Sequence, residues 1–263
     1  MELIQLLAVV AVGLVALFWL LGLAADYLVL EIPFSFEQGM GESMVPDGIV
    51  DGEVPDYLLG LTQRLVEVMD LPSEMTVQVH YLDKPVVNAF AALGGKLVVY
   101  RGLLERLPNE NALAMVLAHE IAHVKLRHPL RSLGRGVVLS VAIATLSGAG
   151  GNTLVSSVVG EAGSLTGLSF SRDQEQAADA EGLRAVVALY GHCAGTRELF
   201  RVLLDEEKNS SLGAPQVEFL RTHPLGTERI EAMEELACEH RQPQRVDTIP
   251  LPSFIPQEKR KMP

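Results

Sequence analysis

The chain has 263 residues, of which 48% are hydrophobic, and a formal net charge of -12. This length allows one large domain or two small ones with a sizeable core. The acidic balance argues against nucleic acid as a partner, because phosphate backbones select basic patches. The cysteines Cys193 and Cys238 fit no Cys-x-x-Cys pattern for metal or redox chemistry. They leave two alternatives open, namely two buried thiols or one disulfide.

Residues 1–27 predict a transmembrane anchor. No charged residue occurs from Leu3 to Ala25, and a helix of that length measures about 35 Å, enough to cross a bilayer core of ~30 Å. A cleaved signal peptide is the alternative, but it normally has a basic start and a shorter apolar run. No Lys or Arg precedes Arg64, so nothing retains this flank in the cytoplasm. We therefore expect a single-pass anchor with the body on the periplasmic or extracytoplasmic side.

The next part of the chain alternates between turn-rich and regular segments. Residues 28–56 are rich in glycine, proline and acids, which is typical of an extended linker. Leucines at helical spacing then predict a helix that Pro72 ends. The alternation in "TVQVHYL" predicts a strand. The stretch "PVVNAFAALGGKLVVY" predicts two short strands joined at Gly94-Gly95, the second running from Lys96 to Tyr100.

The second half of the chain is expected to be mostly helical. Asn109 can cap a long helix that contains "LAHEIAHVKLRH". Residues 137–168 are apolar but interrupted, and we expect a helical lid or plug, buried or leaning on the membrane, in preference to two further spans. Ser171 and Gln174 form a capping-box pattern for another helix. The tail 243–263 holds several prolines and is expected to be mobile.

The stretch "LAHEIAHVKLRH" predicts a metal site. His119 and His123 are one helical turn apart, so both imidazoles can reach one zinc ion at ~2.0–2.1 Å. Glu120 points about 100° away, so it flanks the metal and can hold a water against it, as in the H-E-x-x-H motif. The alternative is an exposed helix with incidental histidines. It fits poorly, because apolar flanks nearly all round predict a buried helix, in which unpartnered polar groups are costly.

A third metal ligand is expected on the helix that contains "SRDQEQAADAEGL". A catalytic zinc needs three protein ligands and an open position for water. Glu175 is the candidate ligand, and Asp179, one turn further on, can accept a hydrogen bond from a ligand histidine. Glu181 and Asp173 are rivals that helical phase places off this face. The alternative for this helix is an acidic, solvated surface.

Four segments occur in a characteristic order: "NAFAALGGKLVVYRGLL", "NENALAMVLAHEIAHVKLRH", "SRDQEQAADAEGL" and "THPLGTERI". Together they resemble the M48 family of gluzincin peptidases, and "IPFSFEQGMG" resembles the segment after the anchor in its exported bacterial OMA-like members. The resemblance implies an α+β, mostly helical zincin domain with a small β-sheet, over residues 57–242. It also implies one zinc ion per chain, with Glu120 as general base. The implied ligands are His119, His123 and Glu175.

The resemblance also implies residues that act on the substrate. His223 and Arg229 match family positions that face the reacting carbonyl, where a donor or cation steadies the oxyanion. From the residues alone, His223 is only a turn histidine before a proline. Asn88 and Ala89 match a segment that holds the substrate backbone in other gluzincins. We expect an extended substrate to add to the edge of the following strand. That strand contributes Lys96, Leu97 and Val98.

These features lead to an expected function. The chain is predicted to be a membrane-anchored zinc metalloendopeptidase that cleaves unfolded or damaged proteins in envelope quality control. One alternative is an inactive chaperone or scaffold with the same fold, although such a relative usually lacks the base or a ligand. Another is a processing protease of narrow specificity, which would need a large membrane chamber built from many spans. The expected partners are misfolded proteins and the lipid bilayer.

Overall fold

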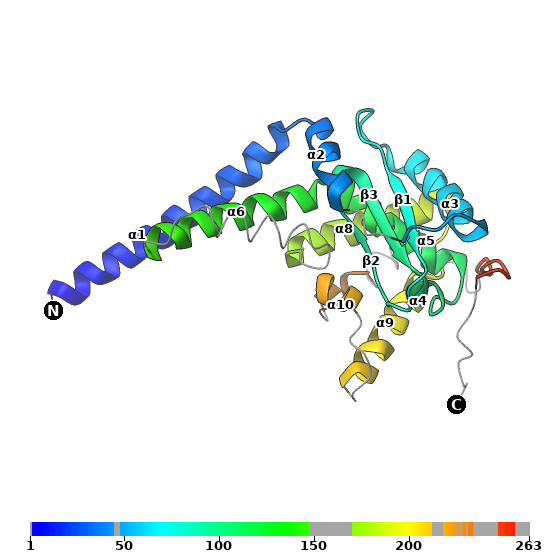
Figure 1. The fold of residues 1–263 in the computed structure, drawn as a ribbon. Helices are drawn as coiled ribbons and strands as arrows, with labels where there is room; N and C mark the ends of the chain where they lie inside the picture. Colours follow the sequence, from blue (N-terminus) through cyan, green and yellow to red (C-terminus); the bar gives the residue numbers. More distant parts are fainter. Residues whose placement is uncertain are drawn as a thin grey trace.

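The computed structural model describes residues 2–44, 48–147, 170–211, 218–224, 226, 228–229, 231–233 and 247–255. Helices dominate these ranges, and one three-stranded sheet lies among them (Figure 1). This confirms the expected α+β, mostly helical class. The α-helices are α1 (Glu2–Leu28), α2 (Phe34–Gly41), α3 (Glu53–Met69), α4 (Arg101–Leu104), α5 (Glu110–Lys125), α6 (His128–Ser147), α8 (Arg172–Tyr190), α9 (Thr196–Ser211) and α10 (Glu218–Thr222). Short 3-10 helices are η1 (Val29–Glu31), η2 (Glu42–Met44) and η3 (Leu93–Gly95).

The sheet contains β1 (Gln78–Leu82), β2 (Ala89–Ala91) and β3 (Lys96–Tyr100) in the order β1-β3-β2. β1 runs parallel to β3, and β2 runs antiparallel to it with Ala89 opposite Val99. The expected strand pair with its turn at Gly94-Gly95 is therefore confirmed. β3 is the central strand, however, and both of its edges are already paired. The prediction that Lys96, Leu97 and Val98 receive a substrate by edge pairing is wrong for this reason. The edge strands are β1 and β2, and β2 is the one that packs against α5.

Helix α5 forms the centre of the body. Its residues from Glu110 to Val124 are all buried, and it packs against α8, α3, α9 and β2 (Figure 1). Helix α3 contributes the buried stripe Leu58, Leu61 and Leu65 to the same core. The apolar flanks of the histidine motif are thus explained by a helix with neighbours on every side.

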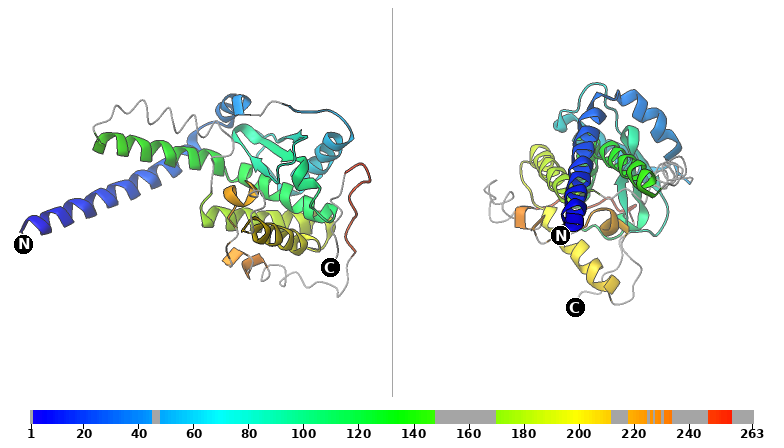
Figure 2. Two further views of the ribbon diagram at one scale, coloured as in Figure 1. Left: turned by 60° about the horizontal axis from the view of Figure 1, so that its bottom comes forward. Right: turned by 90° about the vertical axis from the view of Figure 1, so that its left-hand side faces the viewer.

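Helices α1 and α6 project together from this body (Figures 1 and 2). Among the described residues, α1 is the one helix long and apolar enough to cross a membrane, over Ile4–Leu28. α6 lies beside it, and Arg135 forms an ion pair with Asp26 at 2.5 Å. The expected lid 137–168 falls partly on α6, whose residues up to Ser147 run along α1. Residues 148–169 of that prediction lie outside the described residues.

Two segments differ from their predictions. Residues 28–56 were expected to be extended, but they contain α2 and the first turn of α3. α2 is held against η3, where a Cβ on Gly94 would lie 2.5 Å from the Cα of Gln38. This close approach explains why the turn requires glycine.

The tail was expected to be mobile, but residues 247–255 pack on the body. The Ile249 carbonyl accepts a hydrogen bond from the Glu110 amide at 2.8 Å, and the Ile249 amide donates to Asn111 Oδ1 at 2.9 Å. Ile255 is buried, and Phe254 meets Tyr57 edge to face at 6.0 Å. The mobile-tail prediction is therefore wrong for this stretch, because its apolar side chains and backbone find partners. The rest of 243–263 lies outside the described residues.

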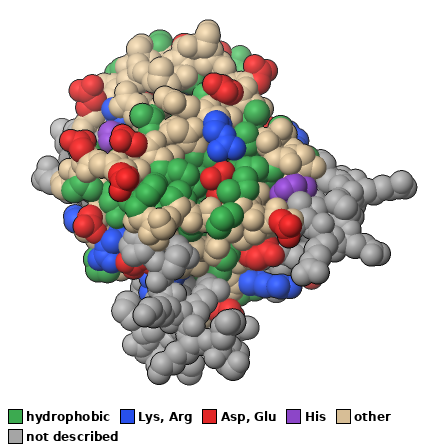
Figure 3. Space-filling view, turned by 90° about the vertical axis from the view of Figure 1, so that its right-hand side faces the viewer, with side chains coloured by type: hydrophobic (Ala, Val, Ile, Leu, Met, Phe, Trp, Pro, Cys, Tyr) green, Lys and Arg blue, Asp and Glu red, His purple; other side chains and the backbone are tan. Residues whose placement is uncertain are grey.

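The outer surface is acidic in keeping with the net charge of -12. On the face opposite the projecting helices, acidic side chains are spread around a central group of apolar ones (Figure 3). Cys193 is buried, whereas Cys238 lies outside the described residues. The two alternatives for the cysteines therefore stay predictions.

Candidate metal centre

Two capped helices carry the candidate ligands. The Asn109 side chain accepts a hydrogen bond from the Ala112 amide at 2.8 Å and starts α5. Ser171 and Gln174 form the predicted capping box that starts α8. The two helices touch at Gly182, where an added Cβ would lie 3.1 Å from the His119 amide nitrogen. A small residue at this position lets α8 bring its carboxylates to the histidines of α5.

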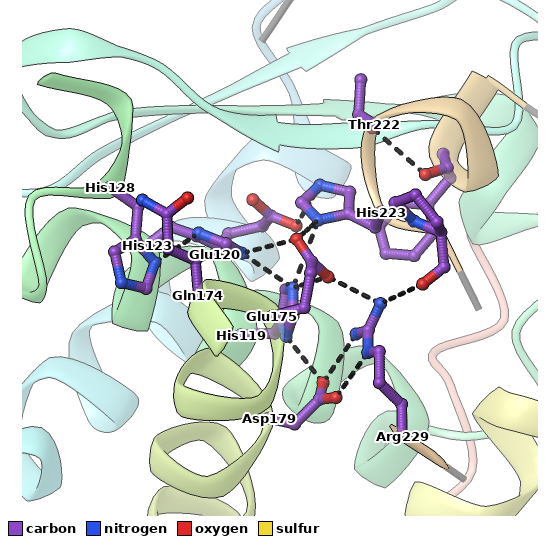
Figure 4. Close-up of polar contacts among 12 residues, drawn as sticks. His119, Glu120, His123, His128, Gln174, Glu175, Asp179, Thr222, His223 and Arg229 are labelled. Atoms are coloured by element: carbon purple, nitrogen blue, oxygen red, sulfur yellow. Dashed lines mark hydrogen bonds and ion pairs between the residues drawn. The ribbon is translucent and has the colours of Figure 1, made fainter. Parts of the chain in front are cut away.

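Three predicted ligands meet at one point (Figure 4). The Nε2 atoms of His119 and His123 are 2.9 Å apart. The carboxylate of Glu175 lies 3.5 Å from His119 Nε2 and 3.5 Å from His123 Nε2. All three side chains are almost fully buried. Residues 119, 123 and 175 are thus brought together from two helices that are distant in sequence.

This donor set fits a zinc ion. Two ligand atoms at ~2.0–2.1 Å from a tetrahedral zinc lie roughly 3.3 Å apart, and the observed separations of 2.9 and 3.5 Å bracket that value. Two imidazole nitrogens and one carboxylate oxygen are also the donor types that zinc takes at catalytic sites.

Asp179 and Arg229 contact the candidate ligands His119 and Glu175. Asp179 Oδ1 lies 2.9 Å from His119 Nδ1, which leaves Nε2 of that ring for the metal. Arg229 donates to both carboxylate oxygens of Asp179, at 2.8 and 2.9 Å, and its Nη1 lies 2.6 Å from Glu175 Oε2. Its Nη1 also donates to the Pro224 carbonyl at 2.9 Å. The resemblance assigns Arg229 to the reacting carbonyl, and in the structure its guanidinium contacts the carboxylates of Asp179 and Glu175.

The buried carboxylates stabilise positive charge within the cluster. Burial is the largest influence on His119 and lowers its pKa, but the carboxylates of Asp179 and Glu175 outweigh it and raise the pKa to about 10. Burial also opposes ionisation of Asp179, yet the hydrogen bonds from His119 and Arg229 lower its pKa. Burial and the neighbouring charge of His119 lower the pKa of His123, so that ring is neutral. A neutral imidazole is the form that binds a metal.

Glu120 flanks the ligands as the helical phase predicts. Its side chain is fully buried, and desolvation raises the pKa of the carboxyl. Its Oε1 lies 3.4 Å from His223 Nε2. A carboxyl group with a raised pKa beside a metal site is suited to accept and return a proton.

His223 lies deeper in the cluster than its sequence position indicates. Its Nδ1 is 3.3 Å from His119 Nε2 and 3.0 Å from Glu175 Oε1. One donor atom from each of His119, His123, Glu175 and His223 falls within 4.8 Å of the others. His223 therefore belongs to the same buried group of donor atoms, a contact with the metal ligands that the sequence reasoning did not contain.

The remaining candidates are not among the grouped donors. Asn88 is fully buried directly before β2, and Ala89 is the first residue of that strand. The rival ligands lie elsewhere: Glu181 pairs with Lys125 at 3.2 Å, and Asp173 is exposed.

Two residues that contact the candidate ligands are absent from the set that the sequence predicts. His128 places its Nδ1 2.9 Å from His123 Nδ1, and the Phe170 ring stacks on His123 at 4.0 Å. His128 lies in the quoted motif, but its orientation depends on a helix break with left-handed φ at Arg127, which the helical period does not predict.

Comparisons of the sequence identify relatives among known proteases. The beta-barrel assembly-enhancing protease of Escherichia coli is 31% identical over 198 residues, which cover 69% of this chain and 38% of the relative. The mitochondrial metalloendopeptidase OMA1 of Schizosaccharomyces pombe is 30% identical over 185 residues, covering 68% and 52%. OMA1 of Saccharomyces cerevisiae is 29% identical over 164 residues, covering 60% and 46%. The chain thus spans about half or less of the length of these relatives.

A family model described as peptidase family M48 matches residues 56–237. The matched segment contains all the ligand candidates, both helices that carry them and the strand β2. The match covers more than half of the chain, which therefore belongs to peptidase family M48.

Proposed function

We propose that this protein is a membrane-anchored zinc endopeptidase that hydrolyses peptide bonds of unfolded or damaged proteins. One observation carries the proposal: three buried donors from α5 and α8 lie 2.9 to 3.5 Å apart, with the carboxylate of Glu120 beside them. The relatives are named as a protease and a metalloendopeptidase, which supports hydrolysis of peptide bonds. A zinc ion bound there supplies Lewis-acid chemistry, lowering the pKa of a water and polarising a carbonyl.

Each residue of the proposed site then has a defined task. Glu120 takes the proton of the attacking water and returns it to the leaving nitrogen. His223 donates a hydrogen bond toward the oxyanion that develops on the carbonyl oxygen. Arg229 and Asp179 keep the ligands oriented, as their contacts with Glu175 and His119 indicate.

The substrate is proposed to lie extended beside β2. Pairing with a strand edge uses backbone hydrogen bonds and reads few side chains, which suits unfolded polypeptides. Asn88, which is buried directly before β2, is proposed to hold the substrate backbone. The site residues are almost fully buried, so a folded neighbour cannot enter without displacement of the groups that cover them.

The anchor places this chemistry at a membrane. α1 has the length and composition to span a bilayer, and the flank contains no Lys or Arg before Arg64. We therefore propose that the body lies on the extracytoplasmic side, since positive residues mark the cytoplasmic side. Envelope protein quality control is the role that fits this location and an unspecific substrate mode.

A single substitution tests the activity. Glu120→Gln keeps the size of the side chain but cannot accept a proton. We expect the variant to bind one zinc per chain as the wild type does and to lose about 10²–10⁴-fold in the rate of casein cleavage. Metal content is measured by elemental analysis and cleavage by release of labelled peptides.

The control is Glu181→Gln on α8, whose carboxylate pairs with Lys125 away from the cluster. It is expected to retain full activity. A wild-type protein that binds zinc but cleaves no unfolded substrate would support the alternative of an inactive scaffold, and equal rates for Glu120→Gln and wild type would refute the assigned base.

A further inference from the structure

The two ligand histidines are held by different kinds of partner. His119 directs Nδ1 to the carboxylate of Asp179 at 2.9 Å. His123 directs Nδ1 to the imidazole of His128, whose Nδ1 lies 2.9 Å away (Figure 4). In both cases Nε2 is the atom that faces the other ligands. His128 and Asp179 thus occupy equivalent positions, because each contacts the Nδ1 atom of one ligand histidine.

The positions of the ring protons follow from this contact. An imidazole that binds a metal through Nε2 carries its proton on Nδ1 and donates it to a neighbour. Two nitrogens at 2.9 Å cannot both carry a proton along the line between them. His123 must therefore donate and His128 must accept at Nδ1, which places the single proton of a neutral His128 on Nε2.

The backbone holds His128 in this position. α5 ends at Lys125, and Arg127 adopts φ +56°, a left-handed conformation that is uncommon for a residue with a side chain. This break separates α5 from α6, whose first residue is His128. Arg127 Nε donates to the buried Glu37 of α2 at 2.6 Å, which fixes the break to the rest of the body.

The ring of His123 is confined on a second side. Phe170 stacks on it with the ring centroids 4.0 Å apart and the planes 26° from parallel. His128 meets it nearly edge to face, at 4.9 Å and 70°. Stacking restricts the tilt of the ring, but only the hydrogen bond to His128 selects which nitrogen is presented to the metal.

We propose that His128 is a positioning residue, which accepts the Nδ1–H of His123 and thereby fixes the tautomer and orientation of that ligand. The inference rests on the proposed zinc site and adds a residue to it. Partners of this kind contribute about 10–100-fold to metal affinity. The Nδ1–H of His123 is accepted by a neutral imidazole, whereas that of His119 is accepted by a carboxylate. The two ligand histidines are therefore held by hydrogen bonds of unequal strength.

Substitutions at position 128 separate hydrogen bonding from packing. In His128→Asn and His128→Asp, a side-chain oxygen can take the place of Nδ1 and keeps the acceptor. His128→Leu fills a similar space without an acceptor. The zinc dissociation constant of the full-length protein in detergent is measured by competition with a chromogenic chelator. The melting temperature of the metal-free form reports on the fold.

We expect His128→Leu to weaken zinc binding by about 10–100-fold, and the Asn and Asp variants to stay within a few-fold of wild type. His192→Ala, in the loop after α8, is the matched control and is expected to bind zinc as wild type does. Cobalt in place of zinc gives a second readout, because its visible spectrum should change in His128→Leu and not in His128→Asn.

Several results would overturn the inference. Equal zinc affinity of His128→Leu and wild type would show that no hydrogen bond is needed. Folded Asn and Asp variants that bind zinc at least tenfold more weakly would show that shape, and not the acceptor, matters; this arm decides the question even if the Leu variant does not fold. A wild-type protein without zinc affinity would refute the proposed function itself, an outcome that is distinct from both.

Discussion

At the scale of single residues, Arg229 illustrates how much of the site depends on orientation. One guanidinium contacts both oxygens of Asp179, one oxygen of Glu175 and the Pro224 carbonyl. The planar fork of arginine matches a carboxylate with two parallel hydrogen bonds, and a lysine ammonium cannot reproduce this geometry. The site therefore uses its buried cation to hold two carboxylates in register.

Arg229→Lys is predicted to weaken zinc binding by about 10–100-fold, because both Asp179 and Glu175 lose a fixed partner. The charge of the side chain is retained, so a change in affinity reports on geometry. Chelator competition measures the affinity.

The comparison variant is Arg184→Lys, an exposed pair with Glu181 on the same helix as the ligand. It is expected to leave zinc affinity unchanged, since exposed ion pairs contribute little. Unchanged affinity in Arg229→Lys as well would contradict the positioning role of the guanidinium.

At the scale of elements, the segment 247–255 supports the start of α5. The first amides of a helix have no partner inside it, and Ile249 accepts from one of them, at Glu110. The Glu110 carboxylate in turn accepts from Tyr57 and Tyr190, at 2.8 Å each. The helix that carries the histidine motif is thus tied at its first turn to α3, α8 and the chain end.

Removal of residues 247–263 is predicted to lower the free energy of unfolding by about 2–4 kcal/mol. The estimate combines about 1 kcal/mol for each lost hydrogen bond with roughly 2 kcal/mol for the apolar contacts of Ile255. Urea unfolding followed by circular dichroism measures the change.

Truncation after Ile255 is the matched control for that deletion. It keeps the packed stretch and is expected to leave the urea midpoint unchanged. If both truncations unfold at the wild-type midpoint, the contacts of 247–255 do not stabilise the body.

At the scale of the whole molecule, α1 and α6 extend away from a body that holds every ligand (Figure 2). The apolar side chains of α1 are exposed, for example Val15 at 69% and Trp19 at 66%. Apolar area of this extent is unfavourable in water, whereas a bilayer accommodates it. The helix α1 and the metal site are therefore expected to act independently.

A chain that lacks residues 1–25 is predicted to move from the membrane fraction to the soluble fraction with its zinc affinity unchanged. The deletion retains Asp26, whose ion pair with Arg135 steadies the base of α6. Fractionation by ultracentrifugation and chelator competition measure the two properties. Retention in the membrane fraction would show that α6 binds the bilayer by itself, and lost zinc affinity would contradict the independence of the body.

The local pattern of the chain determined much of this description. A period of 3.6 residues places His119 and His123 on one helix face, and the same period places Glu175 one turn before Asp179. Caps at Asn109 and Ser171 could be found because they depend on residues three positions away. The ligand helices follow from such short-range rules, whereas the family and its fold class were inferred from the resemblance of four ordered segments to known peptidases.

Tertiary structure alone decided which distant groups meet. The central place of β3 arises from a parallel partner far back in the chain, so no local pattern shows that its edges are paired. The same holds for the docking of 247–255 and for the contacts of the Arg229 guanidinium with Asp179 and Glu175. The contact of His128 with His123 is short in sequence but depends on the left-handed turn at Arg127. These features depend on packing between separate segments, which periodicity along one segment does not encode.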